Sequence, residues 1–89
     1  KMSDSNTTTN HSTIKKWAEE RNGKPSIVEA TEKNRSGLLR IDFNEKEEGL
    51  KEISWDKFFE IFDENDLAFL YQEETNGSKS RFFKIIDKE

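Results

Sequence analysis

Apolar side chains first recur with helical spacing after Ser12. The positions at i, i+3, i+4 and i+7 are Ile14, Trp17, Ala18 and Arg21. This spacing places all four on one face of a helix. Ser12 or Thr13 can cap the start of the helix, and the sequence NGKP, with its Gly and Pro, predicts its end.

A second stretch with the same spacing follows Ser54, which is a favourable N-cap residue. The positions on one face here are Trp55, Phe58, Phe59 and Phe62. A row of aromatic side chains beside apolar strands is more typical of a core than of a binding platform. The pattern therefore predicts a second helix whose aromatic face, with Phe58 and Phe62 buried, forms most of the core.

Alternating segments predict strands between and after the helices. The sequence PSIVEAT is short and β-branched, and in LLRIDF the apolar Leu39, Ile41 and Phe43 alternate with Arg40 and Asp42. The turn-like EKNRSG separates the two, so we expect a hairpin. The following NEKEEGLKE has no periodicity and is interpreted as an acidic loop.

A second hairpin is predicted from LAFLYQEE and SRFFKIID, which Asn76-Gly77 joins. Asn-Gly favours a two-residue type I′ turn. A regular ladder from that turn sets Glu74 opposite Lys79 and Tyr71 opposite Phe82. One face would then carry Leu67, Phe69, Tyr71, Phe82 and Ile86, and the other Ala68, Leu70, Phe83 and Ile85. Both faces are apolar, which predicts a central strand pair covered on both sides.

These elements predict an α+β fold in the order α-β-β-α-β-β, with one four-stranded antiparallel sheet built from two hairpins and two helices packed on it. Residues 1–11 are polar and predicted to be a disordered tail, which leaves 12–89 as a single small domain. A shift of 41 residues lays the first helix pattern on the second. Few residues match, so an internal duplication stays open.

Composition narrows the function classes. The 89-residue chain has 38% charged residues, a net charge of −4 and no cysteine, and no apolar stretch approaches a membrane span. We therefore expect a soluble cytoplasmic protein without a membrane partner. Its one histidine, His11, has no Ser or Cys partner and no glycine-rich phosphate loop is present, so we expect no catalytic site, cofactor or metal site.

Three segments together resemble a family of small bacterial proteins of unknown function. They are TIKKWAEERNGKP, GLLRIDF and ISWDKFFEIFDENDLAFLYQ, and the resemblance runs from Ser12 to Ile86. Asn22 stands where the family pattern has a Gly, which could shift the end of the first helix. Some relatives carry the label of glucan branching enzyme, but such enzymes need a barrel of about 250 residues. The resemblance implies a self-contained bacterial domain and no activity.

An acidic cluster at the end of the second helix is one candidate site. Asp63, Glu64 and Asp66 lie where the helix dipole already places negative charge, so each carboxylate there is unfavourable when exposed. Asn65 closing the helix in a left-handed conformation, with Asp66 in a turn, is the ordinary explanation. The other is recognition of a protein partner. Tyr71 joins this site because it stands where the hairpin becomes polar and its hydroxyl needs a polar partner.

Basic residues offer an alternative site. Those near the first helix and on the last hairpin are Lys15, Lys16, Arg21, Lys24, Lys79, Arg81 and Lys84. With an aromatic side chain nearby they could bind nucleic acid by charge and stacking. The acidic segment from Glu45 to Glu52 opposes this. We therefore expect a non-catalytic protein-interaction or accessory module, with nucleic-acid association as the alternative.

Overall fold

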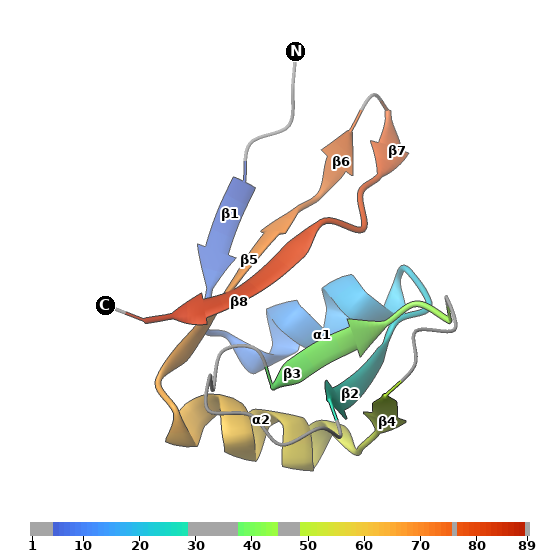
Figure 1. Ribbon diagram of the computed structural model, residues 1–89. Helices are drawn as coiled ribbons and strands as arrows, with labels where there is room; N and C mark the ends of the chain where they lie inside the picture. Colours follow the sequence, from blue (N-terminus) through green and yellow to red (C-terminus); the bar gives the residue numbers. More distant parts are fainter. Residues whose placement is uncertain (1–4, 29–37, 45–48, 76, 89) are drawn as a thin grey trace.

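The computed structural model of the chain describes residues 5–28, 38–44, 49–75 and 77–88, and it is an α+β fold as predicted (Figure 1). The helices are α1 (His11–Glu19) and α2 (Trp55–Glu64). The strands are β1 (Ser5–Thr8), β2 (Lys24–Val28), β3 (Leu39–Asp42), β4 (Leu50–Glu52), β5 (Leu67–Gln72), β6 (Glu74–Thr75), β7 (Ser78–Lys79) and β8 (Phe83–Asp87).

Helix α1 begins earlier than predicted, because Asn10 and not Ser12 or Thr13 is its N-cap. The Asn10 Oδ1 accepts a 2.8 Å hydrogen bond from the backbone N–H of Thr13, which satisfies a free N–H of the first turn. At the other end, Asn22 takes a left-handed conformation with φ 61°. The N–H of Gly23 then donates to the carbonyl of Ala18 at 2.8 Å, so Asn22 does what Gly does in most such helix ends.

Helix α2 begins at the predicted cap, where the Ser54 hydroxyl accepts from the Lys57 N–H at 3.0 Å. Its end differs from the prediction. Asp66, not Asn65, is the left-handed residue, with φ 52°, while the Asn65 side chain donates to the Ile61 carbonyl at 2.9 Å. Short polar side chains tolerate the left-handed region, so either residue can end a helix.

Two three-stranded antiparallel sheets replace the predicted four-stranded one. Their strand orders are β1-β5-β8 and β3-β2-β4, and β6 and β7 form a separate two-stranded ribbon. The two predicted hairpins are present, as β2 with β3 and β5 with β8. Each hairpin gains a third strand instead of joining the other.

The third strands are β1 and β4, neither of which was predicted. β1 lies in the segment expected to be a disordered tail, yet its residues 5–8 pair with β5, with Thr7 opposite Leu70. β4 lies in the segment expected to be an acidic loop and pairs with β2, with Lys51 opposite Ile27. Both strands are short and mostly exposed, so backbone pairing holds them and their side chains need no apolar alternation.

The β5–β8 ladder differs from the predicted register by one residue. Near the turn, Glu74 lies opposite Lys79 as predicted. The predicted type I′ turn involves Asn76, which lies outside the described residues. Beyond it, Tyr71 lies opposite Phe83, not Phe82. One extra residue on the second strand, in the segment Ser80–Arg81 facing Glu73, makes a β-bulge. The predicted faces are therefore wrong for Phe82, Phe83, Ile85 and Ile86.

The core lies between the two sheets and the helices. Its fully buried aromatic residues include Phe58 and Phe62 of α2, as predicted, and Phe69 of β5. Trp17 of α1 contacts rings on both sides of it, with centroids 5.9 Å from Phe43 and 5.3 Å from Phe69. Figure 1 accordingly places α1 between the β5–β8 ladder and the β2–β3 hairpin. One face of the β5–β8 ladder packs on this core.

The two halves of the chain repeat each other at an offset of 44 residues, not 41. The N-caps Asn10 and Ser54 and the left-handed residues Asn22 and Asp66 are both 44 positions apart. Adding 44 to both residues of each facing pair in the β2–β3 ladder gives a facing pair in the β5–β8 ladder. For example, Lys24 opposite Asp42 corresponds to Ala68 opposite Ile86. The strand before each helix pairs with the central strand of the other half. Each half thus contributes one strand to the other half's sheet.

Candidate functional site: the outer face of the β1–β5–β8 sheet

The face of the β1–β5–β8 sheet that points away from the core carries apolar side chains. Because side chains alternate along a strand, the register places these residues together: Thr7 of β1, Ala68 and Leu70 of β5, and Phe82, Lys84 and Ile86 in or beside β8. We call this set the outer face. Phe82 precedes β8, but its carbonyl accepts a 3.3 Å hydrogen bond from the Gln72 N–H, which continues the ladder.

Phe82 is the most unusual residue of the outer face. It is 44% exposed and is the one large hydrophobic side chain in the described part of the chain that is exposed to this extent. Leu70 and Ile86 on the same face are half-buried. Beside them is a shallow hollow of about 380 Å³, which Ala68, Ile86 and the end of β1 line. The outer face therefore presents apolar surface around Lys84.

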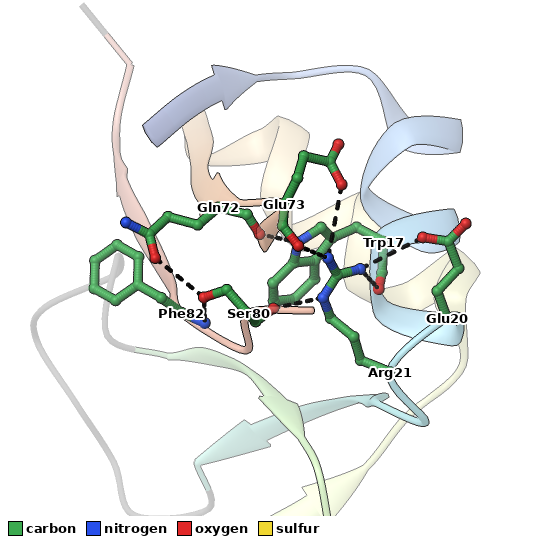
Figure 2. Close-up of polar contacts among 7 residues, drawn as sticks. All are labelled: Trp17, Glu20, Arg21, Gln72, Glu73, Ser80 and Phe82. Carbon is green, nitrogen blue, oxygen red and sulfur yellow. Dashed lines mark hydrogen bonds and ion pairs between the residues drawn. The ribbon is translucent and has the colours of Figure 1, made fainter. Parts of the chain in front are cut away.

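A buried arginine lies directly behind the bulge that positions Phe82. Arg21 follows α1 and is 5% exposed. Its Nε donates to the carbonyl of Ser80 at 2.5 Å, and its Nη2 donates to the carbonyl of Glu73 at 2.7 Å. Its Nη1 donates to the Trp17 carbonyl at 2.8 Å. One side chain thus joins the end of α1 to both strands at the bulge (Figure 2).

Trp17 completes this set of contacts. Its Nε1 donates to the carbonyl of Gln72 at 2.7 Å, and its ring lies under the guanidinium of Arg21, 4.4 Å from the ring centroid. Carboxylates of Glu20 and Glu73 lie 3.5 and 3.6 Å from the guanidinium. A buried cation needs such partners, because an unpaired charge in the interior is strongly destabilising. We call Trp17 and Arg21, with the carbonyls they bind, the arginine cluster.

Ser80 links the arginine cluster to Phe82. Its carbonyl accepts from Arg21, while its hydroxyl accepts from the Phe82 N–H at 3.0 Å and donates to the Gln72 Oε1 at 3.1 Å. Figure 2 shows the Phe82 ring and the Gln72 amide pointing to one side, with Arg21 and Trp17 on the other. The bulge therefore separates a buried polar side from an exposed apolar one.

The structure divides the predicted acidic cluster. Asp63 Oδ1 lies 3.0 Å from His11 Nε2, so this carboxylate has a partner within the fold. His11 is the first residue of α1 and not part of a tail. Glu64 and Asp66 are exposed. Tyr71 is 8% exposed and packs in the core, with its ring centroid 5.7 Å from that of Phe69. Asp63 is exposed as well, so the three carboxylates stay at the surface and Tyr71 does not join them.

The predicted basic residues are also divided. Arg21 is buried and hydrogen-bonded to carbonyls, so its charge is not presented to solvent. Arg81 lies over the ring of Phe43, 5.4 Å from its centroid. The exposed lysines come from four separate elements: Lys15 and Lys16 from α1, Lys24 from β2, Lys79 from β7 and Lys84 from β8.

No group of three or more His, Cys, Asp or Glu side chains that could hold a metal occurs among residues 5–28, 38–44, 49–75 and 77–88. In the same residues, no helix is long and apolar enough to cross a membrane. Comparison of the chain with protein-family models, with curated proteins and with solved structures found no match. The resemblance to the small bacterial family stays a prediction.

The exposed Phe82 and the buried Arg21 were both assigned to the wrong environment from sequence. A signal for each was present. In the predicted register Lys84 would share the core face with Phe69, and a lysine in that position is strongly disfavoured. Arg21 stood on the apolar face of the first helix pattern, a position that indicates burial. Lys84 on the core face indicates a bulge, and Arg21 on the apolar helix face indicates a buried arginine.

Proposed function

We propose that this protein is a non-catalytic domain that binds another protein through the outer face of the β1–β5–β8 sheet. The exposed Phe82 side chain carries this proposal. Exposed apolar surface rimmed by polar residues marks interaction sites in many proteins, and aromatic residues are enriched among the residues that dominate binding energy. Phe82 also lies on a hydrogen-bonded ladder, so it is held in place before a partner arrives.

The chemistry of the outer face indicates what kind of partner fits. Lys84 lies between Phe82 and Ile86 on one strand and opposite Leu70 on the next. A lysine surrounded by apolar side chains complements a carboxylate that is itself flanked by apolar side chains. The proposed partner is therefore a protein surface in which one Asp or Glu stands among apolar residues.

Two other surfaces have weaker support. Glu64 and Asp66 of the acidic cluster are exposed, but Asp63 is engaged by His11, and ordinary solvated helix ends look the same. Arg21 is buried and cannot contact a nucleic acid. Sequence-independent binding to the phosphate backbone needs basic residues gathered on one face, and the remaining lysines lie on four separate elements. Neither surface combines exposed apolar area with a charge as the outer face does.

Capture of proteins from the native host by immobilised variants tests the proposal. The variants are Phe82→Ser and Lys84→Glu on the outer face, with Glu64→Gln and Lys15→Ser as matched substitutions elsewhere. We expect a protein that the parent, Glu64→Gln and Lys15→Ser retain at physiological salt, and that both outer-face variants lose. Nuclease treatment before capture should change nothing.

Three results would contradict the proposal. Equal retention by all variants would remove the outer face from binding. Loss in Glu64→Gln alone would assign binding to the acidic cluster. Loss on nuclease treatment, with a steep dependence of binding on salt, would point to nucleic acid. A thermal melt of each variant checks that the fold is intact.

A further inference from the structure

We propose that Arg21 is a positioning residue for the outer face: it holds the bulge that turns Phe82 away from the core and towards a partner. Three backbone carbonyls at the bulge accept hydrogen bonds from the arginine cluster. They are those of Gln72, Glu73 and Ser80. Arg21 supplies the last two and also lies against the ring of Trp17.

The turn and the strand impose conflicting registers, and this conflict is why the bulge needs support. The ribbon of β6 and β7 fixes Glu74 opposite Lys79, and a regular continuation would place Phe82 opposite Tyr71. The core requires Phe83 opposite Tyr71, because only then does Lys84 face solvent. One extra residue reconciles the two registers but interrupts the ladder.

At the bulge the arginine cluster supplies donors to the carbonyls of Gln72 and Ser80, while the Glu73 carbonyl accepts from both Arg21 and the Ser80 N–H. A carbonyl left without a donor in a part-buried position is unfavourable. Arginine suits this position because its planar group donates several hydrogen bonds in fixed directions. The Nε and Nη2 groups of Arg21 reach one strand each, Ser80 on one and Glu73 on the other. The side chain therefore fixes the two strands relative to α1 as well as to each other.

The consequence for binding rests on the proposed function, but the structural part can be measured without any partner. Two variants are compared in four combinations: Arg21→Met, deletion of Arg81, both, and neither. Deleting Arg81 removes the extra residue, so that Glu74 opposite Lys79 and Tyr71 opposite Phe83 fit a single residue-for-residue register. Arg21 then has no bulge to hold.

Amide hydrogen exchange of Ser80 and Phe82 is the first measurement, because their N–H groups donate to Glu73 O and Ser80 Oγ within the bulge. In Arg21→Met we expect their exchange to accelerate about tenfold or more, as in local opening. The Val28 amide, which donates to Leu38 across the other sheet, should keep its rate. Deletion of Arg81 should restore slow exchange at Phe82 in the double variant.

A fluorine label on Phe82 gives the second measurement. The broadening of its signal by a soluble paramagnetic agent should change in Arg21→Met, because the ring no longer keeps one position, and should return to the parent value in the double variant. Unchanged exchange and unchanged fluorine signals in Arg21→Met would overturn the inference. If Arg21→Met does not fold, the double variant decides: a folded double variant supports the bulge role, and an unfolded one overturns it.

The two proposals can fail separately. If Phe82→Ser keeps its partner while exchange at the bulge responds as expected, the binding surface is wrong and the role of Arg21 stands. If Phe82→Ser loses its partner and Arg21→Met changes neither exchange nor binding, the surface stands and Arg21 does not position it.

Discussion

The imidazole of His11 lies flat on the ring of Phe59, with centroids 4.1 Å apart and planes 7° from parallel. This contact joins the first residue of α1 to the middle of α2. The same imidazole reaches Asp63 at 3.0 Å, so one side chain covers the aromatic face of α2 and pairs with a carboxylate at its C-terminal end. An acidic residue is unfavourable at that end of a helix, and the contact with His11 gives this carboxylate a hydrogen-bond partner.

The contact predicts that two neighbouring carboxylates differ in their effect on stability. Asp63→Asn should lower the free energy of unfolding or leave it unchanged, because a partner of His11 is weakened. Glu64→Gln should raise it by about 0.3–1 kcal/mol, because it only relieves an unfavourable charge near the end of α2. Chemical denaturation of the two variants side by side measures both. Equal stabilisation by the two substitutions would show that His11 contributes nothing to Asp63.

Two phenylalanines should respond very differently to truncation. Phe58 is fully buried, so Phe58→Ala should lower the free energy of unfolding by about 3–5 kcal/mol through lost burial and the cavity left behind. Phe82 is exposed, and Phe82→Ala should change stability by no more than about 0.5 kcal/mol. Denaturant titration gives both values. A large loss for Phe82→Ala would mean that its ring supports the fold.

Two glycines are needed for different reasons. A methyl group at Gly23 would lie 2.5 Å from Ile41 Cγ2 and 2.8 Å from Phe43 Cε1, so Gly23→Ala should disturb the core and cost about 1–3 kcal/mol. At Gly77, φ is +81° and a methyl group meets nothing within 4 Å. Gly77→Ala should cost about 1–2 kcal/mol through backbone strain alone. Chemical shifts of Phe43 should move in the first variant and not in the second.

The helix caps give a prediction with an internal control. Asn10→Ala and Ser54→Ala should each lower stability by about 1 kcal/mol, since each removes the acceptor for an N–H of the first turn. Ser12→Ala should be nearly neutral, because Ser12 lies inside α1 and Asn10 is the cap. Thermal melts of the three variants test this. A loss in Ser12→Ala as large as in Asn10→Ala would place the start of α1 later.

How much of the fold can be predicted from the sequence depends on whether the cause of each feature is local. The helices and the two hairpins were predictable because their buried side chains, such as Phe58 and Phe69, must recur with a fixed period. The α2 cap was predictable because Ser54 precedes the aromatic pattern directly. These features depend on neighbours in the sequence, and their physical causes are local.

Register and the two added strands depend on distant residues. The Asn-Gly turn and the alternation that keeps Lys84 in solvent require strand registers that differ by one residue. Arg21, which binds the carbonyls at the resulting bulge, is distant in the sequence. Strands β1 and β4 are short and polar, so periodicity carries no signal for them. The His11–Asp63 contact connects positions 52 residues apart. Pairings of this kind become visible only when the chain is folded.

The exchange of strands between the two halves makes them mutually dependent. β1 stands before α1 but completes the sheet around β5, and β4 stands before α2 but completes the sheet around β2. Neither half can open without removing an edge strand from the other, so unfolding should be all-or-none despite the internal repeat. A half expressed alone would keep a helix, a hairpin and a strand with no place to pair. It would find that place in a second copy of itself, as a domain-swapped dimer.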